Sequence, residues 1–84
     1  MITTDPATAS RAAALFVSYL SAGDRPTPAA VEAAIKHALL THGGTNGCAA
    51  DVAAAFGDYP ETAVARMVWA RGLVANVPAL ANAA

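Results

Sequence analysis

Hydrophobic positions recur with the spacing of an α-helix along most of this 84-residue chain. Val31, Ile35 and Leu39, for example, follow one another at four-residue intervals, which places them on one face of a helix. No segment alternates between apolar and polar residues in the way of a half-buried strand, so we expect no β-sheet. The pattern predicts four helices, over residues 6 to about 22, 28 to about 41, 47 or 48 to 56, and 60 to about 76.

Capping and stop residues agree with these boundaries. Asp5–Pro6 and Thr27–Pro28 each place a side chain that can cap backbone N–H groups directly before a proline at the first helical position. Gly23 and Gly57 are expected to end the first and third helices, because glycine readily adopts the left-handed conformation found there. We therefore predict an all-α fold, a small four-helix bundle. Its single domain covers residues 1–77, and residues 78–84 form a frayed tail.

Alanine makes the expected core thin. The chain is 56% hydrophobic, but 24 of those residues are alanines, which favour helices and contribute little apolar area each. A chain of this size gains only limited stability from burial, and a second copy often completes such a core. We therefore expect a homodimer.

The first predicted helix is apolar almost all round, which is typical of a helix that is central or shared between subunits. Because a central helix is difficult to cover in so short a chain, the pattern favours a seam between two copies. The fourth helix carries one stripe that is expected to face inward, formed by Ala63, Val64, Met67, Val68 and Arg71. Trp69 lies aside from this stripe, and as the largest apolar side chain of the helix it is a candidate anchor at the same boundary. The candidate interface residues are Leu15, Phe16, Tyr19, Leu20 and Trp69.

The segment "ADVAAAFGDYPETAVARM", residues 50–67, resembles a helix-turn-helix over about a quarter of the chain. Ala53 is the small residue facing the second helix, Gly57 lies in the turn, and Pro60 opens the second helix. Two departures put the docking angle in doubt: the position after the glycine is Asp58, where an apolar residue is usual, and the late anchor position is Arg66.

This resemblance implies a second interpretation, a DNA-binding regulator whose contacts are Thr62, Arg66 and Arg71. Duplex binding depends on several phosphate contacts, and two arginines supply few. The net charge of −1 does not indicate a nucleic-acid partner either. A dimer that places two Arg66/Arg71 pairs on one face, about 34 Å apart, would favour this interpretation.

A longer segment, "THGGTNGCAADVAAAFGDYPETAVARMVWA", resembles part of short alanine-rich actinobacterial proteins of unassigned function. It covers roughly the second half of the chain. The resemblance implies a source lineage and no activity. The matching residues are His42, Gly43, Gly44, Thr45, Gly47, Cys48, Ala49, Pro60, Glu61, Thr62, Ala63, Arg66, Met67, Trp69 and Ala70.

Catalytic and metal chemistry find little support in the residue pattern. Cys48 and Asp51 can share a helix face, but two ligands do not hold zinc, and no base is visibly oriented to activate Cys48. We expect no enzyme activity, no metal and no cofactor. A single cysteine and the absence of a signal-like or membrane-spanning run predict a cytoplasmic protein that does not bind membranes. The favoured function is a self-associating, regulatory interaction module that binds an unidentified protein partner.

Overall fold

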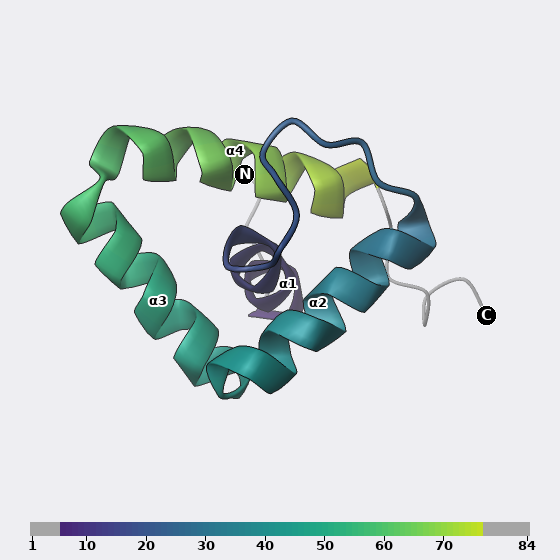
Figure 1. The fold of residues 1–84 in the computed structure, drawn as a ribbon, viewed down its shortest axis with the longest axis horizontal. Helices are drawn as coiled ribbons and strands as arrows, with labels where there is room; N and C mark the ends of the chain where they lie inside the picture. The colour runs from purple at the N-terminus through teal and green to yellow at the C-terminus, as the bar shows by residue number, and fades with distance from the viewer. Residues whose placement is uncertain (1–5, 77–84) are drawn as a thin grey trace.

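The computed structural model describes residues 6–76 and shows four α-helices within that range (Figure 1). They are α1 (Pro6–Phe16), α2 (Pro28–His42), α3 (Gly44–Asp58) and α4 (Pro60–Asn76). The prediction of an all-α fold with four helices is confirmed. The predicted tail, residues 78–84, lies outside the described residues.

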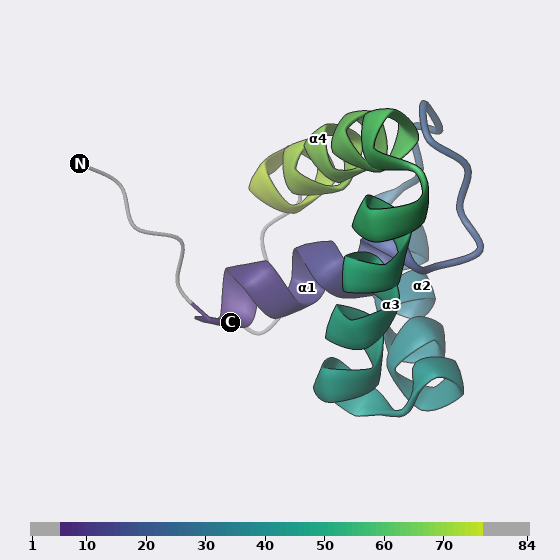
Figure 2. The same ribbon diagram turned by 90° about the vertical axis from the view of Figure 1, so that its left-hand side faces the viewer.

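Helix α1 occupies the centre of the molecule. Figure 1 looks nearly along its axis and shows α2, α3 and α4 arranged around it, and Figure 2 shows the same helix from the side. It contacts each of the other three helices, and Leu15 is completely buried while Phe16 is 6% exposed. The expectation that Leu15 and Phe16 lie at a seam between copies is therefore wrong, because three short helices of the same chain suffice to cover them.

Helix α1 ends at Phe16, six residues before the predicted end at Ala22. The last turn tightens, because the amide of Ser18 bonds to the carbonyl of Leu15 at 3.1 Å and the Ser18 hydroxyl donates to the same oxygen at 2.7 Å. The chain then leaves the helical path and runs as a loop over residues 17–27, which lies beside α4 (Figures 1 and 2).

Two caps define α2, and the first is the one that the sequence predicts. The Thr27 hydroxyl accepts a hydrogen bond from the amide of Ala30 at 3.1 Å, and Gly43 ends the helix with a φ of 82°. Between these ends, Glu32 forms a two-bond ion pair with Arg11 of α1. This hydrogen bonding lowers the pKa of Glu32, partial burial opposes the shift, and the charge of Arg11 adds to it.

The corner between α2 and α3 is tighter than predicted, and α3 begins at Gly44 instead of Gly47 or Cys48. Gly44 also has a positive φ, 77°, so two consecutive glycines reverse the chain. The helix then passes so close to α2 that a Cβ at Gly47 would lie 1.5 Å from the carbonyl oxygen of His42. Glycine at position 47 is therefore required by this approach of the two backbones.

The joint between α3 and α4 is shorter than the turn of a helix-turn-helix. Gly57 is helical, and Tyr59 alone separates the two helices. The usual turn has three or four residues and often a glycine with a conformation of its own. The prediction that Gly57 ends the helix is wrong, because the amide of Tyr59 still bonds to the carbonyl of Ala55 at 2.7 Å and so completes the last helical turn.

Candidate interaction surface on α4

Helix α4 has an inner face that packs on the other described residues and an outer face that does not contact them. The inner face combines small apolar residues with one arginine at helical spacing. Its members are Ala63, Arg66, Met67, Ala70, Leu73 and Val74. The outer face is exposed, and its members are Glu61, Val64, Ala65, Val68 and Arg71.

This division corrects the apolar stripe that the sequence predicts most simply for this helix. Val64, Val68 and Arg71 were expected to face inward together with Ala63 and Met67. Val64 is 54% exposed and Val68 is 66% exposed, whereas Ala70, with no exposure, lies in the core. Alanine suits the inner face because α4 crosses the alanine-rich α1, where short side chains allow close approach.

Arg66 is the polar centre of the inner face. Its guanidinium donates three hydrogen bonds to backbone carbonyls, to Phe16 at 2.5 Å, Ser18 at 3.1 Å and Leu20 at 2.7 Å. These carbonyls lie at and after the end of α1, where the helix itself supplies no donors. Arg66 therefore fixes the point at which α1 ends, and its rigid set of donors suits this task.

The surroundings of Arg66 are partly apolar. The guanidinium carbon lies 5.9 Å from the ring centre of Phe16 and 4.9 Å from that of Trp69, distances typical of cation–π contacts. Burial lowers the pKa of the guanidinium, but arginine remains charged in proteins.

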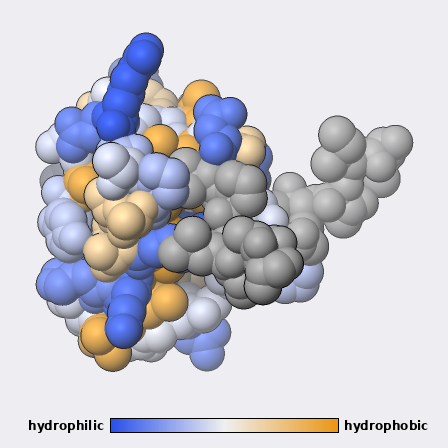
Figure 3. Space-filling model, turned by 90° about the vertical axis from the view of Figure 1, so that its right-hand side faces the viewer, coloured by the Kyte–Doolittle hydropathy of each residue, from blue (hydrophilic) through white to orange (hydrophobic). Residues whose placement is uncertain are grey.

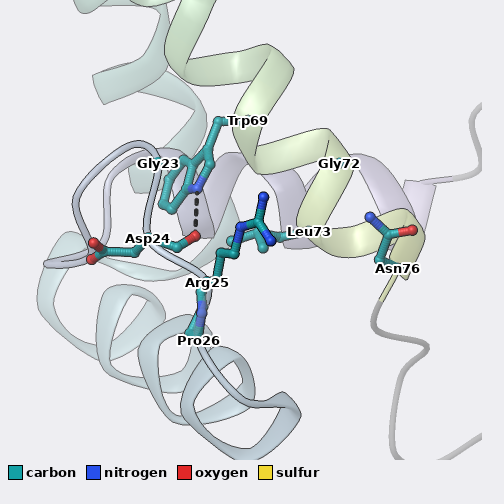
Figure 4. Close-up of a pocket in the computed structure, with 8 residues that line it drawn as sticks. All are labelled: Gly23, Asp24, Arg25, Pro26, Trp69, Gly72, Leu73 and Asn76. Carbon is teal, nitrogen blue, oxygen red and sulfur yellow. Dashed lines mark hydrogen bonds between the residues drawn. The ribbon is translucent and has the colours of Figure 1, made fainter.

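Trp69 fixes the loop that follows α1. Its indole N–H donates to the carbonyl of Asp24 at 3.2 Å (Figure 4). We call Arg66 and Trp69 together the α4 clamp, because both hold the segment between α1 and α2. Beside the clamp lies an open cleft of about 580 Å³. Its lining comes from the loop and the second half of α4: Gly23, Asp24, Arg25, Pro26, Trp69, Gly72, Leu73 and Asn76 (Figure 4).

The remaining candidate interface residues, Tyr19, Leu20 and Trp69, differ in their burial and in their contacts. Tyr19 is 61% exposed and its ring meets that of His37 edge-on, at 5.1 Å between ring centres. Leu20 is half-buried against the core, and Trp69 is half-buried in the clamp. With Leu15 and Phe16 inside the chain, the five residues do not form one continuous exposed seam.

The three candidate DNA contacts are not brought together either. Thr62 and Arg71 are both exposed, but nine residues separate them, which places them about 180° apart around the helix axis. Arg66 is engaged with three carbonyls of its own chain. Within one copy, Thr62 and Arg71 therefore lie on opposite flanks of α4, and Arg66 points inward.

His42, Asp51 and Cys48 do not form a catalytic arrangement in the described residues, because each makes a structural contact of its own. The Nδ1 atom of His42 lies 2.5 Å from a carboxylate oxygen of Asp51, which ties the end of α2 to α3. Cys48 is completely buried, with its sulfur 3.8 Å from the carbonyl of Ala38. Burial raises the pKa of the Cys48 thiol, and the charge of Asp51 raises it further, which disfavours the nucleophilic thiolate.

Other surfaces of the described residues carry less organised features. On the face shown in Figure 3, which includes the end of α4, hydrophobic residues outside the grey atoms form small patches between hydrophilic ones. Leu40 on α2 is 78% exposed but stands alone on its helix turn. Among residues 6–76, no helix is long and apolar enough to span a membrane, and no group of three or more ligand side chains could hold a metal ion.

In comparisons with known proteins, the chain matches no family model, no curated protein and no solved structure. The resemblance to alanine-rich actinobacterial proteins therefore stays a prediction. One sequence signal could have located the outer face of α4. The stripe formed by Ala63, Met67, Ala70 and Val74 also has helical spacing, and if it packs inward, Val64 and Val68 must face outward.

Proposed function

We propose that the protein is a small helical interaction module that self-associates through the outer face of α4. One observation carries the proposal: Val64 and Val68 are more than half exposed, and they lie one helical turn apart on the same face. Isolated exposed apolar residues are ordinary, but a contiguous apolar surface with few charges is typical of a contact site.

The composition of the core supports the same proposal. Among residues 6–76, six of the twelve buried hydrophobic residues are alanines, so burial within one copy removes little apolar area for each ordered residue. Covering Val64 and Val68 in a second copy adds apolar burial without any change in the fold. Self-association thus has a thermodynamic reason as well as a surface.

The proposal is tested by sedimentation of the full chain over a concentration range from about 1 μM to about 1 mM. We expect the unchanged chain to pass from monomer to dimer within that range, and Val68→Asp to remain a monomer. Leu40→Asp is the matched control, because Leu40 is equally aliphatic, more exposed and located on α2. It should dimerise like the unchanged chain.

Circular dichroism of both variants checks that their helices are intact. A chain that stays monomeric throughout the range contradicts the proposal. Equal loss of dimer in the Leu40 and Val68 variants contradicts it as well, because the effect is then not specific to the outer face of α4.

A further inference from the structure

The charges on the outer face of α4 are arranged to complement a second copy of the same face. Glu61 lies in the first turn of the helix and Arg71 lies near its end, with Val64 and Val68 between them. All four residues fall within one side of the helix at 100° per residue, and all four are exposed. No intramolecular ion pair is recorded for Glu61 or Arg71 among the described residues.

The four residues are spaced symmetrically along the helix about position 66. Glu61 precedes position 66 by five residues and Arg71 follows it by five, while Val64 and Val68 are two residues before and after the same point. In an antiparallel helix pair with its two-fold axis at this level, every residue faces the one at the same distance on the other side of the axis. Such a pair places acid opposite base and valine opposite valine, twice each.

We propose that α4 pairs with α4 of a second copy in antiparallel orientation, with Glu61 of each copy facing Arg71 of the other and Val64 facing Val68. This register deepens the self-association proposed above and depends on it. Two further facts favour a second copy as the occupant. The macrodipoles of antiparallel helices attract each other, and the net charge of −1 per chain causes little repulsion between copies.

A parallel pair has none of this complementarity. It would set Glu61 against Glu61 and Arg71 against Arg71, and like charges oppose association. The pattern therefore distinguishes between the two orientations, which a purely apolar face does not. Because the contact consists of one helix face per copy, we expect a dissociation constant on the order of micromolar or weaker.

Charge reversal provides the test. Glu61→Arg and Arg71→Glu each convert both ion pairs of the dimer into like-charge contacts, and we expect each to weaken dimerisation about tenfold in sedimentation equilibrium. The double variant Glu61→Arg/Arg71→Glu restores opposite charges at both contacts and should return to within about threefold of the unchanged chain. An equimolar mixture of the two single variants should form mixed dimers in preference to either homodimer.

Thr62→Arg is the matched control for the helix itself. It adds a positive charge in the same first turn of α4 but on a flank of the outer face. We expect it to dimerise like the unchanged chain. If it weakens the dimer as much as Glu61→Arg, the effect acts through the helix end, and the proposed register is overturned.

Cysteine crosslinking tests the register through a different readout. Val64→Cys and Val68→Cys chains, mixed and oxidised by air with a copper catalyst, should form a disulfide between the two variants more readily than within either one. The unchanged chain is the blank, because Cys48 is buried. Preferential crosslinking of the Val64→Cys chain to itself overturns the register and indicates a parallel pair.

The outcomes separate this inference from the function on which it rests. A monomeric chain at every concentration overturns both. A dimer that Val68→Asp abolishes, but that the charge variants leave unchanged, retains self-association through α4 and overturns the register alone.

Discussion

Each face of α4 carries residues that depart from the usual relation between hydrophobicity and burial. The inner face contains Ala63 and Ala70, at 2% and 0% exposure, and it also carries the charged Arg66. The outer face contains two valines that are more than half exposed. The inner face packs through its apolar residues, Met67 and Val74 among them, and it accommodates the charge of Arg66 because the carbonyls at the end of α1 need a donor.

Replacement of Arg66 on the inner face should change the free energy of unfolding more than any other substitution in α4. We expect Arg66→Ala to destabilise the fold by about 2–4 kcal/mol, because three backbone carbonyls lose a charged donor. Arg66→Lys should recover little, since an ammonium group cannot reproduce the donor geometry of guanidinium. Arg71→Ala is the outer-face control and should change stability by less than about 0.5 kcal/mol at monomer concentrations. Urea unfolding followed by circular dichroism measures all three.

A larger side chain should be the next most damaging change on the inner face and should be tolerated on the outer face. Ala70 is completely buried, so Ala70→Leu should cost about 1–3 kcal/mol through overpacking against α1. Ala65→Leu introduces the same side chain on the exposed side of α4 and should leave the free energy of unfolding almost unchanged. Thermal melts of the two variants give the comparison directly, and equal destabilisation would contradict the assignment of faces.

The glycine of α4 should respond in the opposite direction. A Cβ at Gly72 meets nothing within 4 Å, and the residue is helical without a positive φ. Gly72→Ala should therefore stabilise the fold by about 0.5–1 kcal/mol. Gly47→Ala is the contrasting variant, since its Cβ would collide with the His42 carbonyl, and it should destabilise the corner between α2 and α3.

The smallest expected effect concerns pH and lies away from α4. The pKa of Glu32 is lower in the folded chain than in the unfolded one, so the stabilisation by Arg11 is complete above the unfolded value near 4.5. It is lost as the pH falls through the lower folded pKa. We expect Glu32→Gln to remove at most about 1 kcal/mol at pH 7 and to flatten the fall in stability below pH 4.5. The free energy of unfolding of Glu32→Gln, measured at several pH values, would fall with the same slope as that of the unchanged chain if the ion pair contributed nothing.

Local sequence signals predicted the helices well where capping was local. Thr27 and Gly43 define α2 through bonds within a few residues, and such bonds can be anticipated from the sequence. The early end of α1 could not be predicted in this way. It depends on Arg66, which is 50 residues away from Phe16 along the chain.

The interaction surface could be predicted only in part, for a related reason. Two apolar stripes compete on α4, and the one that contains Val64 and Val68 was expected inside. Which stripe packs depends on the path of α1 and on the loop held by Trp69, and both are tertiary features. The importance of Trp69 was anticipated from its size, but its contact with Asp24 of its own chain was not.

Methyl spectra recorded as the protein is diluted test the central claim most directly. The methyl groups of each valine give separate signals, so the exposed Val64 and Val68 can be followed beside Val31, which is completely buried in α2. We predict that dilution shifts the signals of Val64 and Val68 together and leaves those of Val31 and Leu40 in place. Signals of Val64 and Val68 that stay fixed while the protein dissociates would contradict the account, because another surface would then hold the copies together.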